Sequence, residues 1–503
     1  MDMHFIYKQC RIPSLSWLAV IEKGNDDIIV YHGDKVEVSD KWFVSGIWDG
    51  DFQEGDFEKC HFACCSGMKI SDTQTAVGGV KIVSTQHISE QLFSYKDSNR
   101  WTFANSLAFL IEFNQLPLDI NSYSYEEVLG SVLYGREGWS KKIQISKTSE
   151  ILIHRSCILA IDEKLNCTES SFDSNLHFIN FQDYIGKVRS ILSLLKNNAV
   201  DKNRKHRYGM ISTISTGYDS LAVSALAHEQ GCNEVITFKE PAHDRGDGIA
   251  LKLGFEKIYL RHSNEFYYNT KDLEAEACCS GNMGGANFSA FEDLTQGKII
   301  FMGFRGDTIW DKINPNVNDE FDFSKHGFLY DTCLHNYEFC YRTNSVIVPL
   351  PMIGLDRWSE VNRISNSEEM KEWSVGGDYD RPIPRRIVEE KGIRREVFGF
   401  KKQGAGTSYH FDTYNRLKGK MSKTSFLSLE EFKVHCRRNR IKKICYSIAY
   451  YCKEWPTYAN YVLNKLRLHY HFDDKNTGKM ASPVSSLLFL WGLSVVRKRY
   501  NIR

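Results

Sequence analysis

The pattern of hydrophobic and polar positions changes its period at about residue 180. Before residue 165, short apolar or alternating runs are separated by Gly, Asp and Asn, which is typical of β-strands. These runs are WLAVIEK, DIIVYHG, GGVKIVST and EILIHRS. One segment, residues 123–135, has helical spacing, and the Ser-, Asn- and Asp-rich residues 165–178 are typical of a linker. The sequence therefore predicts a β-rich first domain over residues 1–165.

The next part of the chain alternates between strand and helix patterns. A helix is predicted at FQDYIGKVRSILSLLKNNA, and strands at YGMIST, NEVITF and KIYL then alternate with helices at SLAVSALAHEQG and GIALKLGF. This alternation is typical of a parallel sheet with crossover helices. We therefore expect the fold class to be α/β, with a doubly wound parallel sheet in a second domain over residues 180–475.

The strongest apolar run, Ser482 to Val496, is followed by the basic segment RKRYNIR. The run is too short to predict a transmembrane span, so we expect none. A packed C-terminal helix within residues 480–503 is the favoured interpretation. The alternative is a membrane-surface anchor, with Arg497, Lys498 and Arg499 against lipid headgroups.

Composition limits the partners and the compartment. At 503 residues the chain is long enough for two domains, and its net charge of +1 gives no general attraction to nucleic acid. The 14 cysteines are scattered and the first residues lack a long apolar stretch, so we expect a cytoplasmic protein. Cys60, Cys64 and Cys65 lack the paired spacing of a zinc site and are expected in the core.

A hydroxyl-rich turn joins the first strand of the second domain to its first helix. It contains Ser215, Thr216, Gly217, Tyr218, Asp219 and Ser220. Parallel sheets bind ligands outside the carboxyl ends of their strands, and a helix N-terminus attracts anions. A carboxylate beside a polyphosphate is repulsive without a cation, so Asp219 indicates Mg²⁺. A Ser/Asp helix cap is the alternative interpretation of the turn on its own.

These residues resemble the pyrophosphate loop of the ATP-pyrophosphatase superfamily, whose usual form is Ser-Gly-Gly-x-Asp-Ser. Thr216 stands in place of the first glycine. Members cleave ATP between the α and β phosphates and adenylate a carboxylate or carbonyl oxygen. The resemblance implies ATP and Mg²⁺ as cofactors, with Ser215, Thr216, Gly217, Tyr218 and Ser220 around the phosphates.

Three later segments resemble asparagine synthetases of this superfamily. Phe238 ends the second strand, whose backbone pairs with adenine in the family. The stretch IIFMGFRGDTIWD resembles a second phosphate and magnesium element, so Gly303 is expected at the nucleotide and Asp307 at the metal with Asp219. Lys402, with Lys401 one position away, matches a catalytic lysine that offsets the charge on the phosphates. Taken singly, Asp307 is also typical of an aspartate in a turn, and Lys401 and Lys402 are typical of solvated lysines.

The first domain resembles the N-terminal, glutaminase-like (Ntn-type) domain of asparagine synthetases, on the strength of residues 89–113 and 132–135. A working glutaminase of this class uses an N-terminal cysteine as nucleophile and base. This sequence starts with Met1 and its first cysteine is Cys10, so we expect no glutamine hydrolysis. β-Lactam synthetases and lasso-peptide cyclases also lack this cysteine, yet adenylate a carboxylate and use an amine already on the substrate.

A second departure concerns the general base. In asparagine synthetases a glutamate stands three residues before the metal-binding aspartate, but here that position is Phe304, and Thr308 follows Asp307. Tyr379 or Asp378 is the suggested replacement, although both also suit a cap of the next helix.

The sequence therefore predicts an ATP- and Mg²⁺-dependent ligase that joins a small-molecule or peptide carboxylate to an amine or ammonia, with Asp219, Asp307 and Lys402 catalytic. Two alternatives remain open. One is a nucleotide-binding scaffold with decayed catalysis. The other is a nucleic-acid-modifying relative that uses CRRNRIKK, which is disfavoured by the net charge. The substrate stays undetermined, and a homo-oligomer remains open.

Overall fold

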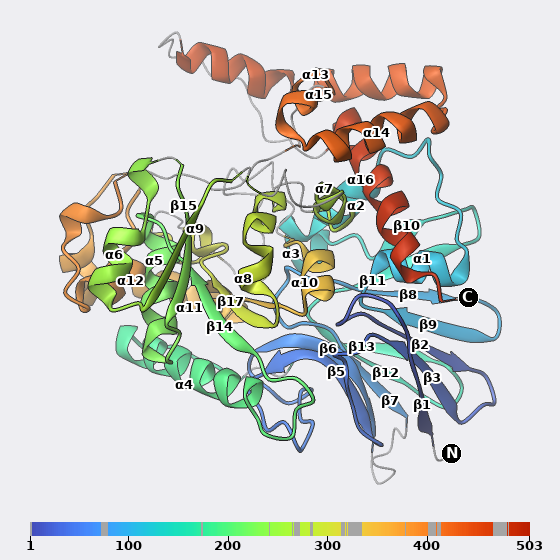
Figure 1. Cartoon of the computed structure of the whole chain (residues 1–503), viewed down its shortest axis with the longest axis horizontal. Coiled ribbons are helices and arrows are strands. Elements are labelled where there is room, and N and C mark those ends of the chain that lie inside the picture. Colours follow the sequence, from blue (N-terminus) through green and yellow to red (C-terminus); the bar gives the residue numbers. More distant parts are fainter. Residues whose placement is uncertain are drawn as a thin grey trace.

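The computed structural model describes residues 3–71, 79–172, 175–240, 242–263, 265, 272–281, 285–312, 317, 319, 334–377, 379–400, 409, 414–465, 480 and 482–502. Its fold is mixed α/β, with two antiparallel-rich sheets at the start of the chain and one parallel sheet after them. Figure 1 shows the two regions side by side, with α13, α14 and α15 at the top of the molecule.

The first region consists of two sheets that bury a common core. The larger has the order β1 (His4–Gln9), β3 (Asp27–His32), β2 (Trp17–Glu22), β9 (Arg100–Ala104), β8 (Leu92–Lys96), β11 (Glu150–His154), β10 (Lys142–Gln144). The smaller has the order β13 (Cys167–Ser171), β12 (Cys157–Ile161), β7 (Val80–Val83), β6 (Ala63–Ile70), β5 (Trp42–Trp48), β4 (Glu37–Val38). Val30 and Phe103 of one sheet share a core with Phe43 and Ile82 of the other. This is the β-rich first region that the alternating pattern predicts.

The predicted linker is partly wrong, because Cys167–Ser171 forms the edge strand β13. It pairs antiparallel with β12, while Thr168 to Ser171 are exposed. An edge strand with both faces in water needs no apolar alternation, so its hydrogen bonds to β12 leave no hydrophobic signal in the sequence.

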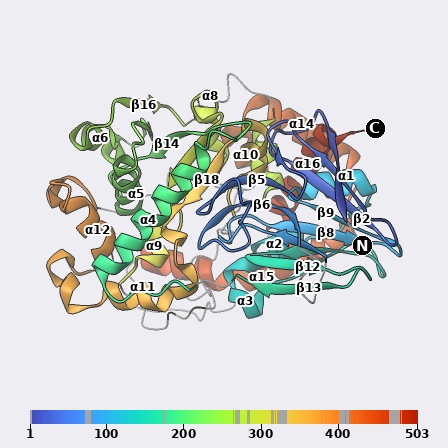
Figure 2. The same cartoon turned by 90° about the horizontal axis from the view of Figure 1, so that it is seen from below.

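The second region is built on a five-stranded parallel sheet. Its order is β16 (Lys257–Arg261), β15 (Glu234–Phe238), β14 (Gly209–Thr213), β17 (Lys298–Met302), β18 (Val346–Pro349). Side chains of successive residues point to opposite faces. Phe301 packs in the core that contains α5 (Tyr218–Glu229), whereas Ile300 packs in the core that contains Leu273 of α7 (Leu273–Cys279). Helices therefore cover both faces, and Figure 2 shows α4 (Phe181–Ala199) alongside the strands.

The remaining helices connect and cover these sheets. They are α1 (Leu107–Asn114), α2 (Tyr125–Gly130), α3 (Gly135–Gly138), α6 (Asp247–Leu253), α8 (Glu292–Thr295), α9 (Gly306–Ile309), α10 (Tyr337–Thr343), α11 (Trp358–Ser365), α12 (Pro382–Glu389), α13 (Tyr414–Lys420), α14 (Lys423–His435), α15 (Arg440–Lys465) and α16 (Pro483–Val496). None of the helices in the described ranges is both long and apolar enough to cross a membrane.

The C-terminal helix is packed inside the protein, as its favoured interpretation predicts. Leu488 and Trp491 of α16 are buried, and a side chain at Gly492 would collide with the backbone of α7. The basic residues that follow do not form a free lipid-binding patch, because Arg497 pairs with Glu112 and Arg499 pairs with Glu276. The membrane-anchor alternative for this segment is therefore wrong.

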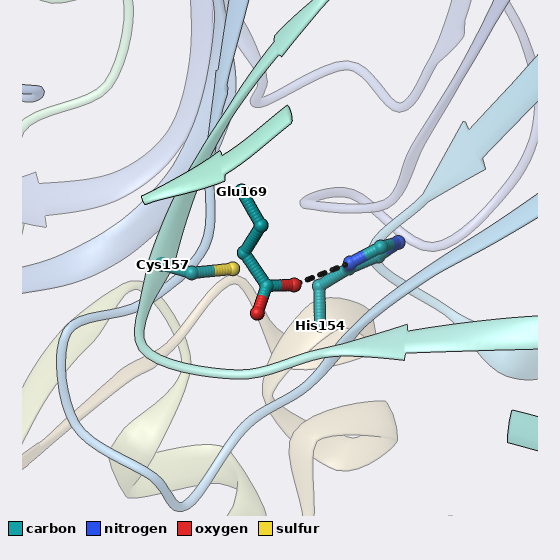
Figure 3. Close-up of side chains that lie close together, drawn as sticks. All are labelled: His154, Cys157 and Glu169. Carbon is teal, nitrogen blue, oxygen red and sulfur yellow. Dashed lines mark hydrogen bonds and ion pairs between the residues drawn. The ribbon is translucent and has the colours of Figure 1, made fainter. Parts of the chain in front are cut away.

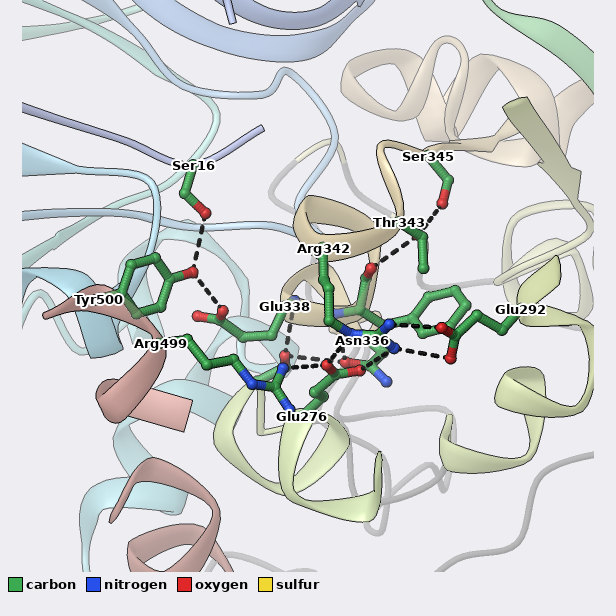
Figure 4. A network of polar contacts seen from close by, with 12 residues as sticks. Ser16, Glu276, Glu292, Asn336, Glu338, Arg342, Thr343, Ser345, Arg499 and Tyr500 are labelled. Atoms are coloured by element: carbon green, nitrogen blue, oxygen red, sulfur yellow. Dashed lines mark hydrogen bonds and ion pairs between the residues drawn. The ribbon is translucent and has the colours of Figure 1, made fainter. Parts of the chain in front are cut away.

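A buried polar network ties this C-terminus to both regions (Figure 4). Tyr500 donates to Glu338 of α10 at 2.7 Å and shares a hydrogen bond of 2.9 Å with Ser16. Ser106, the N-cap of α1, donates to the other oxygen of Glu338 at 2.6 Å. Burial raises the pKa of Glu338 to about 7. The interface between the two regions thus contains a titratable carboxyl whose hydrogen bonds join three segments distant in sequence.

Candidate functional site

A cavity of about 320 Å³ lies at the carboxyl ends of β14, β15 and β17. β14 comes first along the chain in this sheet and lies between β15 and β17, so the strand order reverses beside it. Open parallel sheets bind their ligands at such a reversal, and the volume is in the range of small-molecule pockets. The lining includes Ser215, Gly217, Asp219, Ser220, Phe238, Gly303 and Asp307. The fold thus brings together seven of the ten residues predicted for the site.

The turn after β14 presents hydroxyl and amide groups to this cavity. Ser215 and Ser220 share a side-chain hydrogen bond of 2.8 Å across the start of α5, and the Gly217 amide donates to the Ser215 hydroxyl at 3.1 Å. Gly217 is the N-cap residue and offers no side-chain cap to the helix. Gly217 therefore supplies no cap of the kind that a Ser or Asp provides, and the amide of Tyr218 donates instead to the Tyr379 hydroxyl. This arrangement suits a phosphate group.

Glycines allow the turn after β17 to approach the start of α5. A Cβ atom on Gly303 would lie 2.6 Å from the carbonyl carbon of Asp219. A Cβ atom on Gly306 would lie 2.7 Å from the Cγ atom of Asp219. Asp307 follows Gly306 in the first turn of α9 and lines the same cavity as Asp219. Two carboxylates from separate strand ends thus face one space, which is an oxygen donor set suited to Mg²⁺.

Arg305 adds a positive charge that the sequence interpretation missed. It lines the cavity, is buried, and has a φ of 65°, a left-handed conformation that is uncommon outside glycine. Its guanidinium lies 5.5 Å from the centre of the Phe304 ring. The strained backbone at a strand end is a frequent feature of ligand sites, but it cannot be read from the sequence.

The other end of the cavity is apolar. Phe238 packs against Phe291 and Phe288, with ring centres 5.0 Å and 6.5 Å apart, and Met302 lies beside them in the lining. Phe288 and Phe291 come from the segment Ala286–Phe291, which precedes β17 and carried no signal of function in the sequence. An aromatic end next to a hydroxyl-rich end suits a ligand with a planar base and a polar group.

The charges of the lining favour a cation. Its described residues include the carboxylates Asp219, Glu240, Asp244 and Asp307 but only one strong base, Arg305. A polyphosphate would be repelled by these carboxylates unless a divalent cation lay between them. The paired aspartates therefore suit a divalent cation accompanying an anionic ligand better than they suit a free anion.

Two predicted residues do not line the cavity. The Thr216 hydroxyl donates to Asp244 at 3.0 Å, and its backbone carbonyl accepts from the Gly399 amide at 2.8 Å. Tyr218 is fully buried, and its hydroxyl accepts a hydrogen bond from Arg385 of α12. Both side chains are hydrogen-bonded to other parts of the protein, Thr216 to the cavity residue Asp244 and Tyr218 to Arg385.

The predicted lysine lies outside the described residues, as do its neighbour Lys401 and Asp378. Gly399, three positions before Lys402, touches the loop through its hydrogen bond to Thr216. The role of Lys402 stays a prediction.

Tyr379 lines the cavity but is unsuited to act as a base. Burial, together with the nearby charge of Asp219, raises the pKa of its hydroxyl well above the usual value. The hydroxyl therefore stays protonated at neutral pH and can donate a hydrogen bond but not remove a proton. Of the two bases suggested from the sequence, this one is disfavoured.

The cysteines of the first region do not form an activated site. Cys60, Cys64 and Cys65 are buried as expected, and burial raises the pKa of each thiol. Burial also raises the pKa of the Cys10 thiol, which disfavours the thiolate that a nucleophile needs. Within the described part of the chain, every cysteine is a free thiol.

A separate cluster of His154, Cys157 and Glu169 lies between β11, β12 and β13 (Figure 3). The His154 ring is hydrogen-bonded to Ser94 at 2.8 Å and to Glu169 at 3.3 Å. Lys141 forms an ion pair with Glu169 at 2.9 Å. Burial raises the pKa of Cys157 to about 12. Metal binding requires the thiolate, so these contacts favour a structural role for the cluster.

Comparison with known proteins adds no assignment: no protein-family model matches the chain, and no curated protein is significantly similar to it.

Proposed function

We propose that the chain is an ATP- and Mg²⁺-dependent ligase that adenylates a carboxylate and then forms an amide. The observation that carries this proposal is the position of Asp219 and Asp307 in one cavity, beside the Ser215–Ser220 turn at the reversal of a parallel sheet. It agrees with the resemblance of the loop and of the Asp307 turn to asparagine synthetases. The two β-sheets of the first region, which share a core, are compatible with a glutaminase-like domain.

The proposed roles follow from the two ends of the cavity. Asp219 and Asp307 would hold Mg²⁺, which neutralises phosphate charge when bound. The hydroxyls of Ser215 and Ser220 and the amides in the first turn of α5 would bind the β and γ phosphates. The adenine would lie against Phe238, and the Arg305 guanidinium would offset charge at the phosphates.

The proposed reaction has two steps. A carboxylate oxygen of the substrate attacks the α-phosphorus of ATP, the bond from that phosphorus to the bridging oxygen breaks, and pyrophosphate leaves. An amine nitrogen then attacks the acyl carbon, the bond to AMP breaks, and the amine gives up a proton to solvent water. Because Tyr379 stays protonated, we assign it to hold the substrate by a hydrogen bond.

The test is pyrophosphate release from ATP with a panel of small-molecule and peptide carboxylates. We expect release that depends on one class of carboxylate and falls at least about 100-fold in Asp219→Asn. Carboxylate-dependent release that Asp219→Asn leaves unchanged would contradict the assignment.

A nucleotide-binding scaffold is the second candidate. It is favoured by Phe304, which lines the cavity where asparagine synthetases have a glutamate. Tight MgATP binding without pyrophosphate release from any carboxylate would support the scaffold over the ligase.

A further inference from the structure

Helix α15 carries an apolar stripe on its solvent-facing side. Ile441, Ile444, Ile448, Tyr451, Trp455 and Val462 are 49% to 73% exposed. Ile441 to Trp455 follow one another at intervals of three or four residues, so they form one row along the helix up to Pro456, and Val462 lies seven residues beyond Trp455. Single exposed apolar residues are ordinary on a protein surface, but a contiguous row of this length marks an interaction surface.

The opposite side of α15 rests on the body of the protein. Tyr446 stacks on Tyr123 with ring centres 4.2 Å apart, and its hydroxyl donates to Glu127 of α2 at 2.7 Å. Tyr450 and Glu454, further along this side, are buried. This side of α15 therefore contacts the body of the protein, while the stripe residues are exposed, and the helix lies at the top of the molecule in Figure 1.

The charges beside the stripe are almost all positive. Arg440 and Lys443 are exposed at the start of the helix and line the same surface hollow as Ile444, whereas Lys442 and Lys453 occupy helical positions turned away from the stripe. The only acidic residue of Arg440–Lys465 is Glu454, and it is buried. A helix with isoleucines and aromatic residues on one face and lysines beside them suits the interface of a membrane that carries negative charge.

This charge pattern disfavours the other partners. A second copy of the chain, packed stripe to stripe, would offer no exposed carboxylate of α15 to pair with the basic residues beside the stripe. A nucleic acid would bind the lysines but would leave the isoleucines in water.

We propose that α15 is a membrane-surface helix that binds anionic lipid bilayers through the stripe Ile441–Val462 and the flanking Arg440 and Lys443. The helix lies in the plane of the interface and does not cross the bilayer, because its other side is fixed to α2 and the neighbouring chain. This inference is independent of the reaction at the sheet.

The test is co-sedimentation of the full chain with vesicles of phosphatidylcholine mixed with phosphatidylserine, and with vesicles of phosphatidylcholine alone. We expect binding to the anionic vesicles only. Ile444→Glu combined with Ile448→Glu should weaken vesicle binding at least about ten-fold, since two aliphatic side chains that would enter the membrane are lost. Lys443→Gln should weaken it roughly five-fold.

The matched control is Ile179→Glu combined with Leu251→Glu. It adds the same charge at two exposed aliphatic residues outside α15, whose side chains are 71% and 68% exposed. This variant should bind as the parent does. Failure of the parent to bind anionic vesicles, or equal loss of binding in the control, overturns the proposal. It is also overturned if light scattering shows a dimer that only the α15 variant dissociates, or if the stripe binds RNA in place of vesicles.

Discussion

Gly303 and Asp219 lie so close that a single added carbon on Gly303 would come within 2.6 Å of the Asp219 backbone. This contact joins the turn after β17 to the first turn of α5, and it sets the position of both proposed metal ligands. The geometry of the site therefore depends on the absence of a side chain at Gly303, which lies 84 residues after Asp219 in the chain.

Gly303→Ala should displace the start of α5. Because the colliding atoms belong to backbone, we expect a loss of about 1–3 kcal/mol in the free energy of unfolding and weaker MgATP binding. Chemical denaturation and calorimetry measure the two effects. Gly186→Ala is the control, since nothing lies within 4 Å of its added carbon and it sits in helix α4. It should stabilise the protein by about 0.5–1 kcal/mol, and equal effects of the two variants would contradict the account.

Phe238→Ala should distinguish the contribution of the apolar end of the cavity to ligand binding from that of the hydroxyl-rich end. Loss of the ring removes packing for a base but leaves the hydroxyl-rich turn intact. We expect MgATP affinity to fall roughly ten-fold while the affinity for magnesium pyrophosphate stays within a factor of about two. Competition binding with the two ligands gives both values. A similar loss for both would show that Phe238 supports the fold of the whole site.

Two substitutions of Thr216, which stands where the usual form of the loop has glycine, test its hydrogen bond to Asp244. Thr216→Val removes the hydroxyl that donates to Asp244, whereas Thr216→Ser keeps it. We expect the Val variant to lose about 1 kcal/mol of stability and the Ser variant to lose much less. Thermal unfolding of the pair provides the comparison, and identical melting curves would show that the hydrogen bond contributes nothing.

The raised pKa of Glu338 predicts that the stability of the protein depends on pH. Its pKa is raised to about 7 in the folded protein from an ordinary value of 4.5, so the folded state binds the proton more tightly than the unfolded state. The stabilisation from this group is fully present below pH 4.5 and is lost as the pH rises through about 7.

Glu338→Gln should therefore flatten the stability profile between these pH values, by up to about 3 kcal/mol of unfolding free energy. Denaturation at several pH values measures it. Glu368→Gln, at a carboxyl whose side chain is 81% exposed, should leave the profile unchanged. A parent profile that rises through this window, with no change in Glu338→Gln, would contradict the buried network.

The local pattern of the sequence was sufficient for the elements that carry the phosphate turn. The runs around β14, α5 and β15 have strong periodicity and short connections, so their order and type follow from neighbouring residues. β13 could not be predicted, because an exposed edge strand is stabilised by hydrogen bonds to β12 and not by apolar alternation. The helix α16 was predicted as packed, but not its partner α7, which lies about 200 residues earlier in the chain.

The site was predicted where residues follow strand ends, and missed where the fold brings in distant segments. Ser215, Asp219 and Asp307 are such strand-end residues, and all line the cavity. Phe288 and Phe291 arrive from a connection between α7 and α8, and the orientation of Arg305 depends on its positive φ. Neither feature leaves a local pattern. Tyr379 was placed near the site, but its protonation depends on burial that the sequence does not reveal.

The central claim is that Asp219 and Asp307 bind one nucleotide through Mg²⁺. Calorimetric titration with α,β-methylene-ATP, which resists cleavage at the proposed bond, tests it without the unknown substrate. We expect one site per chain, binding that requires Mg²⁺, and at least about a ten-fold loss of affinity in both Asp219→Asn and Asp307→Asn. Asp40→Asn, at an exposed carboxyl of the first region, should bind as the parent does. Binding that persists in chelator, or that both aspartate variants retain in full, would contradict the account.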